Sequence, residues 1–331
     1  MQPTATEHFC TLFDSGFLPH GLCLYESLCR HSRPFKLWIV CMDDVVESAF
    51  RKLNFPEVVI LPLREVESEK LLAVKPTRTR GEYCWTLSPF IYDMVFDRAL
   101  DAERVTYLDA DLYFFDSPTI LLDEFAASGK DVQITEHAFS PECDQSEASG
   151  RFCVQFQTFR RTPGGFRVRR WWQERCLEWC FARSEDGKFG DQKYLDRWPE
   201  LFGAEVHILQ QIERAMAPWN ASHIARRGPI KPVFFHFHSL RRLSRYHWRL
   251  VAGTPYSREP ATRPLYREYC KSLRRVLRLL ARKRIVYPKP PFLEHWRDIV
   301  RAVMQHRRQN EIHTIILPGG SSQFPVLTKA T

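Results

Sequence analysis

Short apolar segments alternate with helix-like stretches along the first 210 residues. The apolar segments are strand-sized and lie at residues 9–13, 35–41, 57–63, 104–108, 132–135 and 152–159. Helical patterns fall between them, at residues 19–29, 89–100 and 165–183. Apolar strands separated by helices are typical of a parallel sheet that is covered on both faces. The pattern therefore predicts an α/β, Rossmann-like fold with a mostly parallel sheet flanked by helices.

The pattern changes from about residue 241. Apolar residues recur at three- and four-residue spacing around residues 269–280, among many arginines and lysines, and again around residues 292–304. This spacing indicates two amphipathic helices, the first of them very basic. We expect a sheet domain at residues 1–240, a basic α-helical extension at 241–316 and a loose tail at 317–331.

The charge follows the same division. Residues 241–331 contain 20 Lys and Arg against 5 Asp and Glu, a net charge of +15, whereas the first 240 residues contain 28 against 34, a net charge of −6. A basic segment on an acidic body indicates a polyanionic partner.

We expect this partner to be an anionic membrane surface, bound through residues 265–285 with the apolar face of the helix in lipid. The alternative is a basic helix packed on the sheet domain by its apolar stripe. No nucleic acid is expected, because no recognised binding module accompanies the charge.

Composition and cysteine usage narrow the class of protein. The chain is 44% hydrophobic and 26% charged, as in ordinary globular proteins. No run of about 18 apolar residues is present, and the polar N-terminus does not resemble a signal peptide. The ten cysteines are scattered without a Cys-x-x-Cys pair. These features predict reduced thiols and a cytoplasmic location, including the inner face of the membrane.

Acidic residues follow the predicted strands. Asp109 and Asp111 come directly after the apolar segment 104–108, and Asp14 follows the segment 9–13. Ligands bind beyond the carboxyl ends of parallel strands in α/β sheets. Two carboxylates separated by one small residue suit a hard divalent cation, Mn²⁺ or Mg²⁺, which in turn neutralises a diphosphate. An Asp-x-Asp pair alone is a weak signal, because paired acids also terminate strands.

Three later motifs strengthen that signal. Gly190-Asp191-Gln192 comes about 80 residues after the acidic pair, Pro218-Trp219-Asn220 follows, and His236-Phe237-His238 ends an apolar run. In this order the motifs resemble the GT-A glycosyltransferases, specifically the retaining family eight, which transfers sugars from nucleotide diphosphates in the synthesis of bacterial surface polysaccharides. The resemblance covers roughly residues 8–240. It implies the GT-A version of the Rossmann-like sheet.

The resemblance also implies roles for individual residues. Asp109 and Asp111 match the pair that binds the metal and the ribose-diphosphate, and His236 matches the third metal ligand. The residues that match the surroundings of the nucleotide sugar are Asp191 and Gln192 beside the anomeric carbon, Asp14 and Phe17 at the base and ribose, and Tyr83 near the diphosphate. His236 and His238 alternate along an apparent strand, so we expect only one to face the site. His238 is the alternative metal ligand.

The implied reaction is transfer of a sugar from a UDP-sugar to a glycan or lipid-linked acceptor, with retention by front-face attack. Gln192 would stabilise the cation-like sugar and Asp191 would bind its hydroxyls. An Asp191 nucleophile and a merely helix-capping Asp191 are the alternatives at that position.

The chain departs from the family pattern at four places. Cys153 stands where relatives commonly have Asn, Gln155 where they have Gly, and Ser239 replaces the Gly after the histidines. No Lys-Pro-Trp follows Ser239. The departures leave open a degenerate relative that binds a nucleotide sugar or a membrane without turnover. A nucleotidylyltransferase is a further alternative, although Asp14-Ser15-Gly16 is a poor match to the glycine-rich nucleotide loop that it requires.

Overall fold

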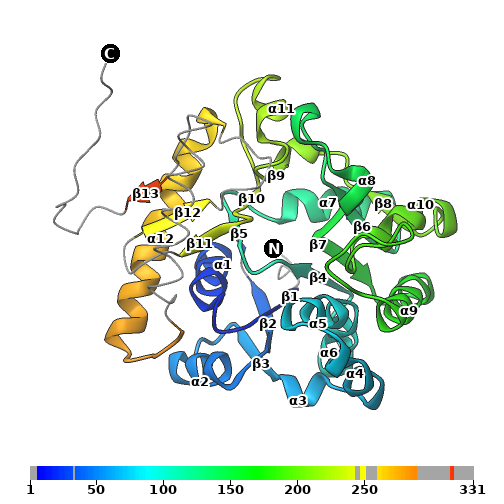
Figure 1. Cartoon of the computed structure of the whole chain (residues 1–331), viewed down its shortest axis with the longest axis horizontal. Coiled ribbons are helices and arrows are strands. Elements are labelled where there is room, and N and C mark those ends of the chain that lie inside the picture. The colour runs from blue at the N-terminus through cyan, green and yellow to red at the C-terminus, as the bar shows by residue number, and fades with distance from the viewer. Residues whose placement is uncertain (1–5, 33, 243–246, 251–258, 289–313, 317–331) are drawn as a thin grey trace, which may run out of the picture. The chain divides into compact units, whose positions relative to one another are not determined.

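The computed structural model describes residues 6–32, 34–242, 247–250, 259–288 and 314–316 (Figure 1). The chain divides into two compact units. The first comprises Met1–His238 and Pro255–Pro288, and the second comprises Ser239–Thr254 and Lys289–Thr331. The predicted helix at 292–304 and the predicted tail at 317–331 lie outside the described residues. In the second unit, β11 (Leu240–Arg242), β12 (His247–Leu250) and β13 (Thr314–Ile316) form an antiparallel sheet.

The first unit is built on a seven-stranded sheet, with strand order β3-β2-β1-β4-β7-β6-β8. The strands are β1 (Glu7–Phe13), β2 (Phe35–Cys41), β3 (Val58–Pro62), β4 (Arg104–Leu108), β6 (Val132–Glu136), β7 (Phe152–Arg160) and β8 (Val206–Ile208). Strands β1 to β4 are parallel, and β7 runs antiparallel to both β4 and β6. The predicted α/β fold with a mainly parallel sheet flanked by helices is confirmed (Figure 1).

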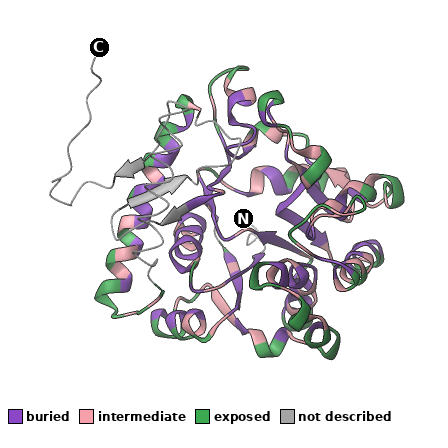
Figure 2. Cartoon of the chain, in the orientation of Figure 1, coloured by how far each residue is buried: buried purple, intermediate pink, exposed green. Residues whose placement is uncertain are grey.

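The central strands are buried along nearly their whole length, which explains their continuous apolar sequences. In β1 and β2 only one residue each is less than fully buried (Figure 2). Helix α1 lies close against β1, because a Cβ on Gly21 would come within 2.3 Å of the Phe13 ring. This close packing fixes the turn between β1 and α1, where Asp14 and Phe17 lie.

Helices connect the strands. The longer ones are α1 (Leu18–His31), α2 (Asp44–Leu53), α5 (Arg80–Leu87), α6 (Ile91–Arg98), α7 (Thr119–Ser128), α9 (Pro163–Glu178) and α12 (Arg263–Arg282), and short ones include α3 (Leu63–Val66), α4 (Glu69–Val74), α8 (Ser146–Ser149), α10 (Trp198–Leu201) and α11 (Ala221–Ala225). Side-chain caps set several starts. Thr79 and Glu82 form a capping box at α5, and Thr162 caps α9. The segment predicted as one helix at 89–100 is a 3₁₀ turn, Ser88–Phe90, followed by α6.

A second, three-stranded sheet carries part of the chemistry. It has the order β5-β10-β9, with β5 (Leu112–Phe114), β10 (Phe234–His236) and β9 (Ala215–Met216). Strands β10 and β5 are antiparallel, and His236 is paired with Leu112. This register places His236 beside Leu112, the residue that follows Asp111, although the two are 124 positions apart.

Helix α12 packs on the sheet unit through its apolar stripe. The buried residues of the stripe are Leu265, Tyr266, Tyr269, Cys270, Leu273, Val276 and Leu280. The expectation that this face enters lipid is therefore wrong, and the packing alternative is confirmed. The helix was expected to belong to an extension at 241–316, whereas it lies in the same compact unit as the sheet.

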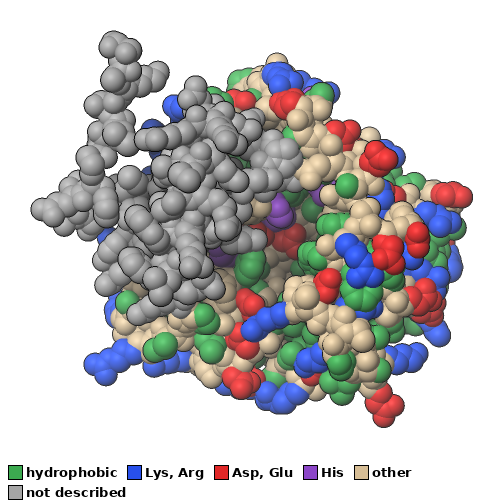
Figure 3. Space-filling model, in the orientation of Figure 1, with side chains coloured by type: hydrophobic (Ala, Val, Ile, Leu, Met, Phe, Trp, Pro, Cys, Tyr) green, Lys and Arg blue, Asp and Glu red, His purple; other side chains and the backbone are tan. Residues whose placement is uncertain are grey.

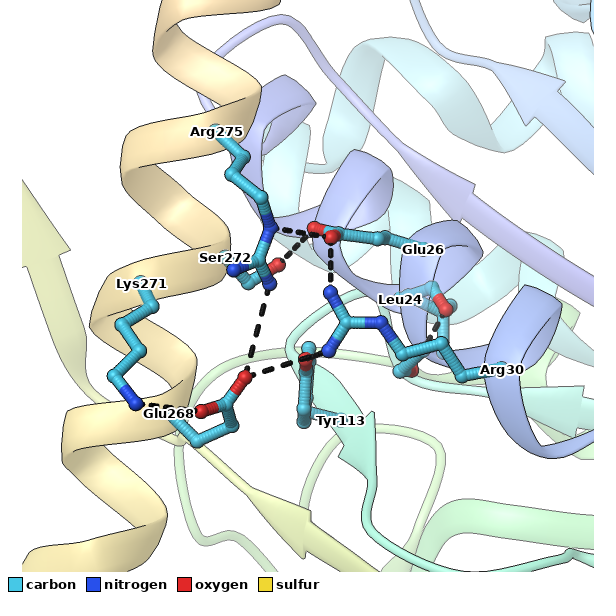
Figure 4. Close-up of polar contacts among 9 residues, drawn as sticks. Leu24, Glu26, Arg30, Tyr113, Glu268, Lys271, Ser272 and Arg275 are labelled. Carbon is cyan, nitrogen blue, oxygen red and sulfur yellow. Dashed lines mark hydrogen bonds and ion pairs between the residues drawn. The ribbon is translucent and has the colours of Figure 1, made fainter.

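Polar contacts join α12 to α1 (Figure 4). Arg275 donates to Glu26 at 2.6 Å, and Ser272 also donates to the Glu26 carboxylate. Deeper in the contact, the Tyr269 hydroxyl and His20 Nδ1 are 2.6 Å apart. The described helices include none that is long and apolar enough to cross a bilayer.

If α12 is part of the folded unit, shortening its apolar stripe will destabilise the whole unit. We expect Leu273→Ala, at a fully buried position, to lower the free energy of unfolding by about 2–5 kcal/mol, through lost burial and a residual cavity. Urea unfolding monitored by tryptophan fluorescence measures it. The matched control is Arg278→Ala on the exposed face of the same helix, with an expected change within about 0.5 kcal/mol. Equal stability of the two variants would show that α12 is an independent appendage.

Candidate metal and nucleotide-sugar site

The acidic pair lies in a tight turn at the carboxyl end of β4. The Asp109 N–H donates to the Gln155 carbonyl oxygen at 3.0 Å, and the Leu112 N–H donates back to the Asp109 carbonyl oxygen at 3.1 Å. The Asp111 carbonyl oxygen accepts from the Phe237 N–H at 2.9 Å. The backbone of the turn is thus fixed between β7 and the end of β10, which leaves both carboxylates to act as ligands.

His236 bridges the turn and β7. Its Nε2 lies 2.9 Å from Asp111 Oδ1 and 3.7 Å from Asp109 Oδ2, and its Nδ1 lies 2.7 Å from Gln155 Oε1. Because an amide oxygen only accepts, Nδ1 carries a proton. A neutral imidazole would then turn its Nε2 lone pair toward the carboxylates. The arrangement requires a cation at Nε2, either a second proton or a metal ion.

His238 lies in the same cluster. One ligand atom from each of Asp111, His236 and His238 lies within 4.8 Å of the other two. The expectation that only one histidine faces the site is wrong. Strand β10 ends at His236, so strict alternation does not extend to His238. Both imidazoles contact the Trp219 ring edge-on, with centroids 5.2 and 5.6 Å apart.

The Pro-Trp-Asn segment places that tryptophan. Asn220 Oδ1 accepts from the Ala217 N–H at 2.8 Å, and its Nδ2 donates to the carbonyl oxygens of His137 and Ala215 at 3.1 and 3.2 Å. These bonds lock the loop that positions Trp219 against the two histidines. Asn220 therefore has a structural role.

Asp191 lies in a turn two residues before a 3₁₀ helix, Lys193–Arg197. The Trp172 Nε1–H donates to the Asp191 carbonyl oxygen at 2.8 Å. Asp191 as a whole is 3% exposed, and its carboxylate Oδ2 has no hydrogen-bond partner among the described residues. Burial and the negative charge of Asp109 raise the pKa of Asp191 to about 8. The helix-capping alternative is not supported, because the cap position is Gln192 and no side chain caps it.

The two members of the acidic pair titrate differently. Burial raises the pKa of Asp109 to about 6, and the charge of Asp111 adds to that rise while His236 opposes it. Burial also disfavours the charged form of Asp111, but its hydrogen bond and charge interaction with His236 lower its pKa below the ordinary value. Asp111 is therefore the permanent carboxylate, and Asp109 gains most from a bound cation.

Not every predicted residue points at the cluster. The Tyr83 hydroxyl donates to Glu67 at 2.9 Å and its ring packs in the main core, which gives it a packing role. Gln192 donates from Nε2 to the Ser149 carbonyl oxygen at 2.7 Å. Its side-chain nitrogen is thus already bonded to the end of α8.

Arg80 is a candidate site residue that sequence reasoning missed. Its guanidinium bridges two strand-end carboxylates, at 3.0 Å from Asp14 and 2.6 Å from Asp43. Asp14 also accepts from the Gly16 N–H at 2.9 Å, and Phe17 packs on His20. The only signal in the sequence was that Asp14 and Asp43 follow adjacent strands. Two neighbouring carboxylates need a basic group to offset their charge. Histidine and acidic side chains appear together near the middle of the face in Figure 3.

Comparison with known proteins gives the fold. No family model matches the chain. The uncharacterized protein YfnF of Bacillus subtilis is 29% identical over 277 residues, which is 80% of this chain and 91% of YfnF. The uncharacterized protein YfnD of the same organism is 27% identical over 282 residues, which is 82% of this chain and 90% of YfnD. Among solved structures, an active-site mutant of LgtC has a TM-score of 0.51 at 12% identity, covering 80% of this chain and 95% of that one. The bifunctional glycosyltransferase WbbM has a TM-score of 0.50 at 10% identity, and the match covers 90% of this chain and 53% of WbbM. The chain has the GT-A fold of these glycosyltransferases.

The charge of Asp191 should oppose folding of the metal-free protein. Because its pKa is raised in the folded state, the folded protein retains a proton that the unfolded chain releases above pH 4, so stability falls as the pH rises from about 4 to 8. We expect Asp191→Asn to be more stable than the wild type at pH 7.5 by on the order of 1–3 kcal/mol, and equally stable at pH 4. Urea unfolding in a chelator measures it, with Asp186→Asn, an exposed position, as control. A pH-independent difference would contradict this assignment.

Proposed function

We propose that the chain is a metal-dependent glycosyltransferase that moves a sugar from a nucleotide diphosphate, a UDP-sugar, to a hydroxyl of a glycan or lipid-linked acceptor. The observation that supports this most is the largely buried cluster of Asp109, Asp111, His236 and His238 at the carboxyl end of β4, in a fold shared with glycosyltransferases. Asp191 interacts electrostatically with Asp109 of this cluster. The cluster is acidic, so it accepts a cation, and the cation in turn accepts a diphosphate.

The donors fit Mn²⁺ or Mg²⁺ through their carboxylates and Mn²⁺ through the imidazoles as well. Asp109, Asp111 and His236 would hold the ion, with His238 as a further ligand. The ion would neutralise charge that develops on the leaving diphosphate. At the nucleotide end, Arg80 and the turn at Asp14 would bind the nucleotide, with Phe17 beside the base.

Asp191 would lie under the sugar. A buried carboxyl group with a pKa of about 8 is uncharged at neutral pH in the metal-free protein, and it becomes anionic when a cation offsets Asp109. In that state it would bind sugar hydroxyls and stabilise the oxocarbenium-like transition state. The side-chain oxygen of Gln192, Oε1, would add to this stabilisation. We propose retention, with the acceptor hydroxyl attacking from the side of the departing phosphate.

Release of UDP tests this proposal. With Mn²⁺ present, we expect slow UDP release from one of the common UDP-sugars, lost on addition of a chelator and reduced at least about 100-fold in Asp111→Ala, because the charge on the leaving group is no longer offset. A coupled UDP assay on a panel of donors measures it. Asp123→Ala, an exposed acid on α7, is the matched control. Turnover that survives Asp111→Ala would contradict the metal assignment, and nucleotide-sugar binding without release would favour the degenerate relative.

We also propose that the acceptor is presented at an anionic cytoplasmic membrane face, which α12 contacts electrostatically. The exposed basic residues of this helix are Arg263, Arg267, Lys271, Arg275, Arg278 and Arg282. Lys271 and Arg275 are paired with Glu268 and Glu26, which leaves the others for phosphate groups. Each such residue near an anionic surface contributes about 1 kcal/mol.

Vesicle binding separates this contact from a general charge effect. We expect the double variant Arg267→Glu, Arg278→Glu to bind phosphatidylglycerol vesicles at least about tenfold more weakly than the wild type at low salt. Co-sedimentation measures the affinity. The control is Lys52→Glu, Lys70→Glu, which changes the net charge equally at exposed positions elsewhere. Equal loss in both double variants would contradict a specific role of α12.

A further inference from the structure

Two departures from the family pattern lie side by side on β7. Cys153 and Gln155 are two residues apart, and both side chains reach His236. Both are buried, with exposed fractions of 3% and 0%. His236 is hydrogen-bonded to Gln155 and lies beside the Cys153 thiol.

Gln155 sets the chemistry of the histidine. Its Oε1 accepts the Nδ1 proton of His236, which leaves Nε2 to face the carboxylates as a ligand atom. Metal-binding histidines in proteins are usually oriented by such a hydrogen bond on the opposite nitrogen. A glycine at position 155 has no side chain to supply it. The substitution therefore strengthens the histidine as a ligand.

Cys153 completes a second set of ligand atoms. Its Sγ, a carboxylate oxygen of Asp109 and an imidazole nitrogen of His236 all lie within 4.8 Å of one another. In a tetrahedral zinc site, bonds of about 2.0–2.3 Å place the ligand atoms about 3.3–3.8 Å apart. The three side chains would therefore move together by up to about 1 Å for one ion to bind all three.

The surroundings of Cys153 favour a role in cation binding over a role in apolar packing alone. Burial, and then the charges of Asp109, Asp191 and Asp111, raise the pKa of the Cys153 thiol, so the thiol is neutral without a cation. The buried Oδ2 of Asp191 has no hydrogen-bond partner among the described residues. The charges that oppose the acidic pair come from histidines. A divalent ion would satisfy this group of carboxylates and allow the thiol to ionise.

We propose that Cys153 is a metal ligand in this chain, and that the site selects a borderline, thiophilic cation such as Zn²⁺ or Co²⁺ over Mg²⁺. Thiolate and imidazole ligands favour such ions, whereas an all-oxygen set favours Mg²⁺. On binding, the S–H bond breaks, the sulfur–metal bond forms and the proton passes to the solvent, with no change of oxidation state. The inference deepens the proposed function, on whose metal site it rests, by naming the class of cation.

Cobalt reports the ligand directly, because a thiolate bound to Co²⁺ absorbs in the near ultraviolet by charge transfer. We expect this band when the chelator-treated protein is titrated with Co²⁺ alone, and its loss in Cys153→Ser and Cys153→Ala. The affinity for Zn²⁺ should fall at least about tenfold in both variants, the range over which even outer-shell changes act. When Zn²⁺ binds to either variant, about one proton fewer should be released than when it binds to the wild type.

The matched control is Cys143→Ser. Cys143 lies in the same small apolar cluster as Cys153 and Trp219, and its thiol donates to the Trp219 carbonyl oxygen at 3.0 Å. It belongs to neither group of candidate ligands among the described residues, so the cobalt band should persist. Circular dichroism of each variant shows that a lost band reflects a lost ligand in a folded protein.

The metal measurement is independent of glycosyl transfer. A wild type without the charge-transfer band, or a band that persists in both Cys153 variants, would overturn the proposal even if UDP release is observed with Mn²⁺. A band that depends on Cys153 in a protein that releases no UDP from any donor would support the ligand and contradict the transferase.

Discussion

The structure depends on an electrostatic constraint at the carboxyl end of β4. Three aspartates, Asp109, Asp111 and Asp191, act on one another in a largely buried region. The groups that offset the acidic pair are imidazoles, and His236 is oriented so that its Nε2 faces two carboxylates. A protein can bury such a group of carboxylates only by protonating them or by binding a cation. The proposed catalytic, nucleotide and metal roles follow if the cluster binds a cation.

Much of the fold serves to hold that cluster. The small β5-β10-β9 sheet fixes the His236 backbone next to the acidic turn through the pairing of His236 with Leu112. Helix α12 supports the same place from outside. The Tyr269 ring stacks on Phe237, between the two histidines in sequence, with centroids 3.8 Å apart and planes within 4°. The Tyr269 hydroxyl meets His20 in α1, just after the proposed nucleotide turn. The helix whose basic composition predicts contact with an anionic membrane surface is therefore also part of the support of the site.

The sequence predicts the sheet and the acidic turn well because both depend on local patterns. Apolar runs mark β1, β2 and β4, and their ends mark Asp14 and Asp109. Contacts between distant segments are not visible in this way. The pairing of β10 with β5 brings His236 to the acidic turn, and the Arg80 bridge depends on where α5 lies after the chain has folded. Short elements such as β5 and β9 contain too few residues to show a period. The amphipathic stripe of α12 shows that one face is buried but does not identify what covers it.

The central claim is that the cluster is a cation site that in turn binds a nucleotide diphosphate. Titration calorimetry of UDP into the protein, with a saturating divalent cation and then with a chelator, tests it most directly. Coupled binding requires that the cation strengthen UDP binding and that UDP strengthen cation binding by the same factor. We predict UDP affinity at least about tenfold higher with the cation, and loss of this difference in Asp111→Ala. Equal UDP affinity with and without the cation would contradict the account.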